Sequence, residues 1–376
     1  MKAFLKEIRD FYKFFNLPKL KKQIVFYSEH GGYYASFEGI ILELSNKHRQ
    51  HIVYITSDIK DPILKVSNDA ITPLYINKTL SFFMPLVDSR VFVMTLTDLD
   101  NHYIKRSKNP VHYIYVPHSL VSVHMAYNFG AFDHYDTIMC AGPHHVRELK
   151  RQEELYKLKP KKLIEAGYYR LERIYDTYSK IQKTPPDIIQ KTILLAPSWG
   201  KDNIIESCGP ELIDALLNKG HRVIVRPHPE TIIRYPKLIN YIEGKFKNSA
   251  NFFLERSVAG DDSILNADLL ICDCSGIALE YALGTERPVL FIDVPVKIKN
   301  KRFEELGIEP TELKLRNKIG KIVSVGQIQQ IAEYAELLIK DSNSYKINCI
   351  EARKSTVCNF KNSSEVISNY IINLIQ

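Results

Sequence analysis

From residue 23 onward, short apolar stretches alternate with amphipathic helical stretches, and this alternation limits the fold more than any other feature. The apolar stretches are almost uninterrupted, as in parallel strands whose sheet is covered by helices on both faces. A helical stretch with an apolar stripe, residues 34–46, separates the first two. The strand candidates in the first half are residues 23–29, 51–57, 89–95, 111–118, 136–142 and 162–168.

A polar segment with two adjacent prolines, Pro185 and Pro186, interrupts this pattern at residues 179–191 and is typical of a linker. The pattern then resumes, with a helix expected over 210–220. The strand candidates there are residues 192–200, 221–229, 251–255, 267–276 and 287–294. The sequence therefore predicts an α/β protein with two doubly wound, Rossmann-like domains that face each other across a cleft.

The expected boundaries follow from this pattern. We expect a basic amphipathic helix over 1–22, a first α/β domain over 23–182 and a second over 190–355. A C-terminal helix over 356–376 could pack back on the first domain. A chain of 376 residues is long enough for two domains of this kind.

Composition excludes several classes of protein. A net charge of +8, from 51 Lys and Arg against 43 Asp and Glu, suits anionic ligands but is too dispersed to predict nucleic-acid binding. The six cysteines show no zinc spacing, so we expect reduced thiols and no metal site. No signal peptide and no apolar run of transmembrane length is present, which predicts a cytoplasmic protein.

Residues 1–22 allow two interpretations. Six apolar side chains recur there at helical spacing among four cations. Such a helix could lie on the anionic inner face of a membrane as a peripheral contact, or it could pack on the core of the protein itself. The apolar residues are Phe4, Leu5, Ile8, Phe11, Tyr12 and Phe15, and the cations are Lys2, Lys6, Arg9 and Lys13.

Neither common nucleotide-binding glycine motif is present. No G-x-G-x-x-G follows a predicted strand, and no G-x-x-x-x-G-K-[ST] occurs. Any nucleotide must therefore be bound by other residues.

Polar residues follow two apolar strands of the second half. "VIVRPHPE" ends in Arg226 and His228, and "LLAPSWG" ends in Ser198 and Trp199, the single tryptophan of the chain. Arg and His are costly to bury, and Pro cannot donate to a sheet ladder, so the chain leaves the sheet at these points. Ligands of open α/β sheets bind at this carboxyl edge of the strands.

A third strand end, in "ICDCSGIALEYALG", carries Asp273, Ser275, Gly276 and Glu280. Ser275 and Gly276 stand at a predicted helix start, where free N–H groups and the helix dipole attract anions. Gly276 would let a phosphate approach the backbone, and Glu280, one turn later, could accept hydrogen bonds from a ribose diol. Together these features indicate a nucleoside diphosphate.

Each of these residues also has a purely structural interpretation. Ser275 could act only as a helix cap, Asp273 could brace the turn, and His228 could bond a loop carbonyl. Their occurrence together at adjacent strand ends favours the ligand site.

The three strand ends resemble, in the same order, the C-terminal domain of the CDP-glycerol glycerophosphotransferases. That family includes teichoic-acid polymerases and primases, with relatives in capsule and lipopolysaccharide synthesis. The resemblance rests on "LLAPSWG", "VIVRPHPE" and "ADLLICDCSGIALEYALGTERPVLFID" and covers about residues 110–295. It implies a GT-B-like fold. It also implies transfer of glycerol phosphate, or a related alditol phosphate, from a CDP-activated donor to a hydroxyl of a surface glycan or glycolipid.

Two positions depart from the family pattern. The family often has Asp-x-Ser-Ser followed by an Asp, whereas here Gly276 replaces the second Ser and Glu280 stands for the Asp. Glu can serve the same diol, so the nucleotide assignment survives, and the identity of the donor alcohol stays open. The donor is a substrate, so we expect no separate cofactor. Because no D-x-D-type carboxylate cluster is placed for one, we also expect no essential metal ion.

The resemblance also implies a catalytic base. His118, in "YVPHSL", matches the histidine of the family's Trp-His-Gly-Thr segment, although Ser119 replaces the glycine and no Trp precedes it. Imidazole titrates in the range that suits proton removal from an acceptor hydroxyl. His124 is expected to be a structural residue on a helix face. With Arg226, His228 is expected to neutralise the donor pyrophosphate and the departing nucleotide.

Further polar residues of the first half could contact the acceptor. His144 and Arg147 follow one strand, with a solvated helix start as the alternative. His30, Gly31 and Gly32 follow another, with a plain tight turn as the alternative.

Three other functions stay open. A GT-B glycosyltransferase would move a sugar from a nucleotide-sugar. A nucleotide-sugar 2-epimerase uses a similar helix start but needs more carboxylates in the cleft than the sequence places there. An inactive scaffold of a surface-polymer assembly would bind no nucleotide.

Overall fold

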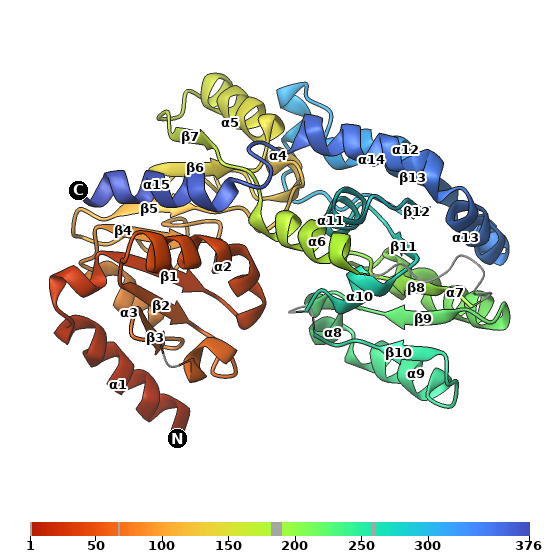
Figure 1. Cartoon of the computed structure of the whole chain (residues 1–376), viewed down its shortest axis with the longest axis horizontal. Helices are drawn as coiled ribbons and strands as arrows, with labels where there is room; N and C mark the ends of the chain where they lie inside the picture. Colours follow the sequence, from red (N-terminus) through yellow and green to blue (C-terminus); the bar gives the residue numbers. More distant parts are fainter. Residues whose placement is uncertain (1, 67, 182–189, 258–259) are drawn as a thin grey trace.

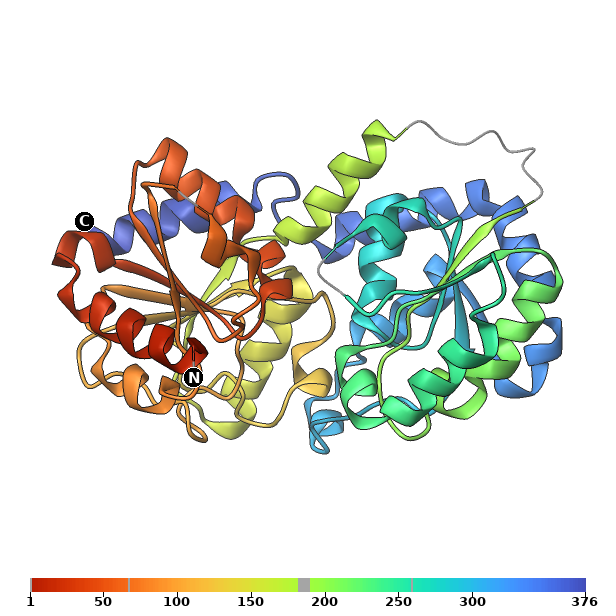
Figure 2. The same ribbon diagram turned by 90° about the horizontal axis from the view of Figure 1, so that it is seen from below.

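The computed structural model describes residues 2–66, 68–181, 190–257 and 260–376. Within this part, the chain forms two α/β domains, each built on a parallel sheet (Figure 1). Viewed from below, the two domains lie side by side (Figure 2). The predicted fold class is therefore confirmed.

The first sheet has seven strands in the order β3-β2-β1-β4-β5-β6-β7, and every neighbouring pair is parallel. Most of its side chains are buried, because helices cover both faces. The strands are β1 (Ile24–Ser28), β2 (Ile52–Thr56), β3 (Ile71–Tyr75), β4 (Val91–Met94), β5 (His112–Tyr115), β6 (Thr137–Cys140) and β7 (Lys162–Glu165).

The second sheet has six parallel strands in the order β10-β9-β8-β11-β12-β13. In both sheets the order reverses beside the first strand of the domain, and a ligand crevice opens at such a reversal. The strands are β8 (Thr192–Leu195), β9 (Arg222–Val225), β10 (Phe252–Leu254), β11 (Leu269–Cys272), β12 (Val289–Asp293) and β13 (Gly320–Ser324).

Two edge strands were not predicted. β3 contains Pro73 and β13 begins at Gly320, and both residues weaken the sequence signal for a strand. They are tolerated because each strand pairs on one side only.

The helices complete the layers. The α-helices are α1 (Lys2–Asn16), α2 (Tyr34–Leu42), α3 (Leu80–Phe83), α4 (Val123–Ala126), α5 (Pro143–Tyr156), α6 (Tyr169–Lys180), α7 (Ile204–Asn218), α8 (Pro229–Arg234), α9 (Pro236–Phe246), α10 (Asp262–Asn266), α11 (Gly276–Thr285), α12 (Thr311–Ile319), α13 (Ile331–Lys340), α14 (Ser342–Thr356) and α15 (Ser363–Ile375). The shorter helical turns are η1 (Lys19–Lys22), η2 (Gly31–Tyr33), η3 (Glu43–Lys47), η4 (Pro62–Lys65), η5 (Met84–Leu86), η6 (Phe303–Leu306) and η7 (Val325–Gln330). The helix expected over 210–220 starts earlier, at Ile204, with Pro210 inside it.

Helix α1 docks on the first domain through acidic side chains. Glu7 Oε1 accepts hydrogen bonds from the backbone N–H groups of Asn77 (2.8 Å) and Thr79 (2.7 Å), and Asp10 Oδ2 accepts one from Tyr75 N (3.0 Å) on the edge strand β3. The helix thus covers an open sheet edge. No helix in the described ranges is long and apolar enough to cross a membrane.

The chain crosses between the domains twice. Of the predicted linker at 179–191, residues 182–189 lie outside the described residues, and α6, which precedes them, packs against both α2 and α11. The return crossing follows α14, and the backbone N–H of Cys358 donates to Ala141 O (2.9 Å). Gly142 and Gly167 make room for this segment, since a Cβ on either would overlap a carbonyl oxygen of Thr356 or Cys358.

The last helix, α15, lies on the first domain (Figure 1). Its Ile367 and Ile371 are buried in one apolar cluster with Ile24, Phe26 and Val91 of the first sheet. The core of the first domain is therefore built from both ends of the described chain.

Candidate active site

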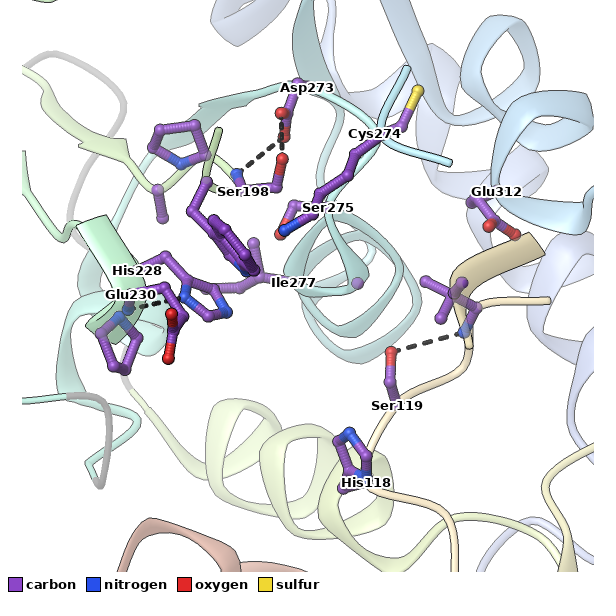
Figure 3. Close-up of a pocket in the computed structure, with 18 of the residues that line it drawn as sticks. His118, Ser119, Ser198, His228, Glu230, Asp273, Cys274, Ser275, Ile277 and Glu312 are labelled. Atoms are coloured by element: carbon purple, nitrogen blue, oxygen red, sulfur yellow. Dashed lines mark hydrogen bonds between the residues drawn. The ribbon is translucent and has the colours of Figure 1, made fainter. Parts of the chain in front are cut away.

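The carboxyl ends of both sheets border one cleft of about 710 Å³ (Figure 3). Ten of the fourteen predicted site residues line it, which brings together side chains from both domains. They are His30, His118, Ser198, Trp199, Arg226, His228, Asp273, Ser275, Gly276 and Glu280.

Helix α11 starts in this cleft. Ser275 is its cap residue by position, yet the Ser275 side chain makes no capping hydrogen bond. The hydroxyl is therefore not used to end the helix. The N–H groups of the first turn and the positive end of the helix dipole face the same space, which suits a phosphate.

Gly276 has a different neighbour from the one expected. A Cβ at this position would overlap Ser119 Oγ of the first domain. The glycine thus lets the loop after β5 approach the helix start, and a side chain here would require the Ser119 hydroxyl to move. The expectation that it makes room for a phosphate is not what the contacts show.

Asp273 braces the strand ends. Its Oδ1 accepts from Ser198 N (2.9 Å), and its Oδ2 accepts from Ser198 Oγ (2.5 Å) and Asn203 Nδ2 (2.5 Å). The Asp273 carboxylate is buried. These bonds tie the loop after β8 to the loop after β11, so Asp273 and Ser198 hold these two loops of the site together. Their predicted direct contact with phosphate is not supported by these contacts.

Trp199 lines the cleft beside His228, with ring centroids 6.1 Å apart. The Lys297 ammonium lies over the indole ring, and the Arg234 guanidinium lies 4.7 Å from its centroid. Burial, followed by the charge of Lys299, lowers the pKa of Lys297 to about 7. An anion bound here would restore the charged ammonium.

His30 and His228 are held in the same way on opposite sides of the cleft. The N–H of Gly32 donates to His30 Nδ1 (3.1 Å), and the N–H of Glu230 donates to His228 Nδ1 (3.1 Å). The neutral rings must then carry their proton on Nε2. Burial, then the charge of Lys297, lowers the pKa of His228 to about 4. The His228 ring is thus neutral near pH 7, with an Nε2–H that can donate a hydrogen bond.

His118 lies in the first-domain wall, between the rings of Tyr33 and Tyr127 (centroids 5.2 and 5.8 Å away). Burial, then the charge of Lys299, lowers its pKa to about 4. The imidazole is thus neutral near pH 7 and able to accept a proton. Ser119, the next residue, touches Gly276, so His118 stands opposite the start of α11 (Figure 3).

Arg226 is more deeply buried than expected. Its Nη1 donates to Ser263 Oγ (2.9 Å) and its Nη2 to Gly260 O (3.0 Å). The guanidinium still borders the cleft, but these bonds anchor it to the loop before α10. A guanidinium held in this way acts on the cleft mainly through the field of its fixed positive charge.

Glu280 already has protein partners. Tyr168 Oη donates to Glu280 Oε1 (2.7 Å), and Arg170 Nε lies 3.4 Å from Glu280 Oε2. Both partners follow β7 of the first domain, so the carboxylate also holds the domains together. Its predicted contact with a ribose remains untested.

The four remaining predicted residues do not line the cleft. A Cβ on Gly31 would meet Asp61 and Pro62 at 3.3 Å, and Gly32 donates to His30, so these glycines form a tight turn. Arg147 is exposed on α5, outside the lining of the cleft. His144 is buried, and its Nε2 bonds Leu120 O (2.9 Å). None of the four thus lies where the proposed acceptor contact would need it, and that contact stays a prediction.

His144 and its neighbours instead fix the loop that follows His118. His145 Nε2 bonds Val121 O (3.0 Å), and Glu148 accepts from Val123 N (2.7 Å). His124 Nδ1 lies 3.0 Å from the same Glu148 carboxylate, and the pKa of His124 is raised because this pair outweighs burial. The structural role expected for His124 is what its contacts show.

Sequence reasoning missed four cations of the cleft: Arg170, Arg234, Lys297 and Lys299. Arg170 lies in the first turn of α6 and Arg234 ends α8, whereas the two lysines lie in the loop after β12. Lys297 and Lys299 lie four and six residues after the end of β12, in "VPVKIKN", so the same strand-end rule could have found them.

Among the described residues, no group of three or more His, Cys, Asp or Glu side chains is arranged to hold a metal ion.

Comparison with known proteins gives one family. The family model "CDP-Glycerol:Poly(glycerophosphate) glycerophosphotransferase" matches residues 11–297. No curated protein matches this sequence significantly.

Solved structures of related shape agree on the fold. The wall teichoic acid polymerase TagF, solved as a His-to-Asn variant soaked with CDPG, superposes with a TM-score of 0.57 at 14% identity, covering 100% of this chain and 98% of that one. The UDP-GlcNAc 2-epimerase of Methanocaldococcus jannaschii, with UDP-GlcNAc and UDP, gives 0.59 at 12%, covering 93% and 99%. A putative 2-epimerase of Listeria monocytogenes gives 0.58 at 10%, covering 94% and 96%. These likenesses show the fold, which is GT-B-like as expected.

Proposed function

Since its family model matches residues 11–297, this chain belongs to the CDP-glycerol:poly(glycerophosphate) glycerophosphotransferase family and is an enzyme of that kind, and we propose that it transfers an alditol phosphate from a CDP-activated donor to a glycan or glycolipid hydroxyl. The alditol in this proposal is glycerol or a close relative. The setting is the synthesis of a surface polymer, such as teichoic acid or capsule.

The observation that carries the proposal is the position of His118 opposite the start of α11. A phosphate at the helix start and a neutral imidazole across the cleft are the two elements that phosphoryl transfer needs. Cations around both supply further stabilisation of charge.

In the proposed reaction, the acceptor oxygen forms a bond to the phosphorus that carries the alditol. The bond from that phosphorus to the bridging oxygen breaks, and its electron pair leaves with CMP. His118 takes the proton of the acceptor hydroxyl. His228 donates a hydrogen bond from Nε2 to the donor phosphates, and Lys297 and Lys299 offset their charge. We propose no cofactor and no metal ion, so turnover should persist in EDTA.

A sugar transfer or an epimerisation remains the alternative. The fold is shared with epimerases, one of them solved with UDP, and three further carboxylates, Glu29, Glu230 and Glu312, line the cleft. The sequence argument that the cleft holds too few carboxylates for an epimerase therefore loses its force. The family match favours the phosphotransferase.

A thermal-shift series with CMP, CDP-glycerol, UDP and UDP-sugars, followed by turnover assays, tests the proposal. We expect the cytidine compounds to stabilise the protein most. Greater stabilisation by UDP-sugars would favour the alternative, and binding of none would favour an inactive scaffold.

We also propose that the protein meets its acceptor at the membrane through α1. The acidic side chains of α1 face the protein, whereas Leu5 and Tyr12 are 63% and 64% exposed next to Arg9 and Lys13. An exposed apolar stripe beside cations suits an anionic bilayer surface. The contacts of Phe11 and Phe14 with Phe83 mean that part of the helix also belongs to the core.

A further inference from the structure

Arg170 is a buried cation in the wall of the cleft that no motif points to. It is the second residue of α6 and belongs to the first domain, and its side chain is 15% exposed. Burying a guanidinium is costly unless its N–H groups find partners. The contacts of Arg170 therefore show what it is placed to bind.

The partners of Arg170 use only part of its donor set. Nη2 donates to Asp261 Oδ1 (3.3 Å), and Nε lies 3.4 Å from Glu280 Oε2 without the geometry of a hydrogen bond. Nε is a buried donor with no acceptor. Within the described parts of the chain, no hydrogen bond involves Nη1. Nη1 can thus still donate to a ligand, whereas Nε is buried beside the Glu280 carboxylate.

The position of Arg170 relates it to both reacting groups of the proposed mechanism. Glu280 lies one helical turn after Gly276 on α11, so the guanidinium stands beside the helix start. Its charge also acts on His118, as one of the cations that, together with burial, lower the pKa of that histidine. Arg170 therefore lies within reach of the space between the helix start and the base.

We propose that Arg170 binds the donor phosphate that is transferred, while the start of α11 binds the phosphate that leaves with the nucleotide. This inference rests on the proposed function. As the acceptor oxygen bonds to the transferred phosphorus and CMP departs with the bridging oxygen, Arg170 donates to the non-bridging oxygens of that phosphorus. Arg is suited to this task because its planar fork matches two phosphate oxygens. Tyr168 and Asp261 fix Glu280 and Arg170 in place.

Arg173 provides a matched control. It lies three residues later on the same helix and pairs with the same Asp261, and its Nη1 donates to Glu38 (3.0 Å). Arg173 does not line the cleft. A role limited to holding the domains together would be shared by the two arginines, whereas phosphate binding belongs to Arg170 alone.

The experiment compares CMP with CDP, because CDP adds the phosphate assigned to Arg170. Dissociation constants are measured by calorimetry for the wild type, Arg170→Met, Arg170→Lys and Arg173→Met, with thermal unfolding as the check of folding. We expect Arg170→Met to weaken CDP about tenfold or more, the scale of a lost charge-assisted hydrogen bond, and to leave CMP unchanged. Arg170→Lys should recover part of the loss, and Arg173→Met should change neither ligand.

Two results would overturn the inference. Equal losses in the Arg170 and Arg173 variants would mean that both only join the domains, and equal losses for CMP and CDP would mean that Arg170 binds no second phosphate. If Arg170→Met fails to fold, the Arg170→Lys variant still tests the inference. A ratio of CDP affinity to CMP affinity in Arg170→Lys equal to that of the wild type would contradict the role of the planar guanidinium. Failure of the wild type to bind any cytidine nucleotide would instead contradict the proposed function, and the inference with it.

Discussion

Ser119 of the first domain rests against Gly276 of the second, at a point where any side chain on residue 276 would overlap the serine hydroxyl. The residue next to the proposed base thus touches the first residue of the proposed phosphate-binding helix. This contact fixes how far the two halves of the cleft can approach each other.

Gly276→Ala tests what the glycine is for. Ser119 Oγ can rotate away from the new methyl group, so we expect a stability loss of about 1 kcal/mol or less. Adding Ser119→Ala should restore that stability, as measured by urea unfolding. If donor affinity recovers in the double variant as well, the glycine serves only the contact between domains. If it stays low, a phosphate also uses this backbone.

His118→Gln should lower kcat by about 10²- to 10⁴-fold and leave the affinity for the donor unchanged, because a base acts in the transition state. Steady-state kinetics with donor and acceptor measure this directly. His134→Gln, at an exposed histidine outside the cleft, is the control. Activity near that of the wild type in His118→Gln would remove the base assignment.

The depressed pKa values of His118 and His228, both about 4, predict a loss of stability in acid. Between pH 6.5 and about 4 the unfolded chain binds protons that the folded rings do not, so the free energy of unfolding falls as the pH falls. Unfolding temperatures at pH 7.5 and 5 should therefore differ less in His118→Gln than in the wild type. An unchanged difference would show that His118 titrates normally in the folded protein.

For α1, the double change Leu5→Ser and Tyr12→Ser should abolish co-sedimentation with anionic vesicles at low salt. These side chains are exposed, so stability should hold. The control pair Leu337→Ser and Ile347→Ser removes side chains that are 60% and 65% exposed on the second domain. Equal binding by the wild type and the Leu5/Tyr12 variant would contradict the membrane proposal.

Truncation of the first twenty residues is a poorer test of the same idea. It would uncover the backbone N–H of Tyr75 on β3 and the ring of Phe83. Loss of vesicle binding could then reflect unfolding of the sheet edge.

The two residues of α5 that the sequence assigned to the acceptor, His144 and Arg147, give opposite expectations. Arg147→Ala should change neither stability nor the KM for acceptor, since the side chain is exposed and remote from the cleft. His144→Ala should cost about 1–3 kcal/mol, because it leaves the buried Leu120 carbonyl without its partner. Urea unfolding and acceptor kinetics distinguish the two. A raised KM for acceptor in Arg147→Ala would reinstate the original assignment.

The sequence was sufficient where the signal is local. Apolar runs such as that of β11, and the polar residues that end them, follow from the neighbouring residues alone, and they located His118, His228 and Ser275 in one cleft. The edge strands β3 and β13 were missed because Pro73 and Gly320 weaken the local pattern, and their pairing partners lie elsewhere in the chain.

Errors arose where a distant partner decides the role of a side chain. His144 and His145 look like a solvated helix start until the carbonyls of Leu120 and Val121 are placed beside them. The place of Arg170 beside the start of α11 is evident only from its contact with Glu280, 110 positions later. Glu7 looks like the polar side of a membrane helix, yet it caps backbone groups of the loop after β3. Such contacts have no signature within a short window of sequence.

The position of α15 has a consequence for biosynthesis. During translation all seven strands of the first sheet are made before α15. The apolar surface of Ile24 and Phe26 is therefore covered only when Ile367 and Ile371 have been made. The nascent chain must therefore hold an unfinished core while the whole second domain is made. A chain that ends after α14 would have an intact second domain and an uncovered first sheet. Such a protein would be a substrate for chaperones and proteases.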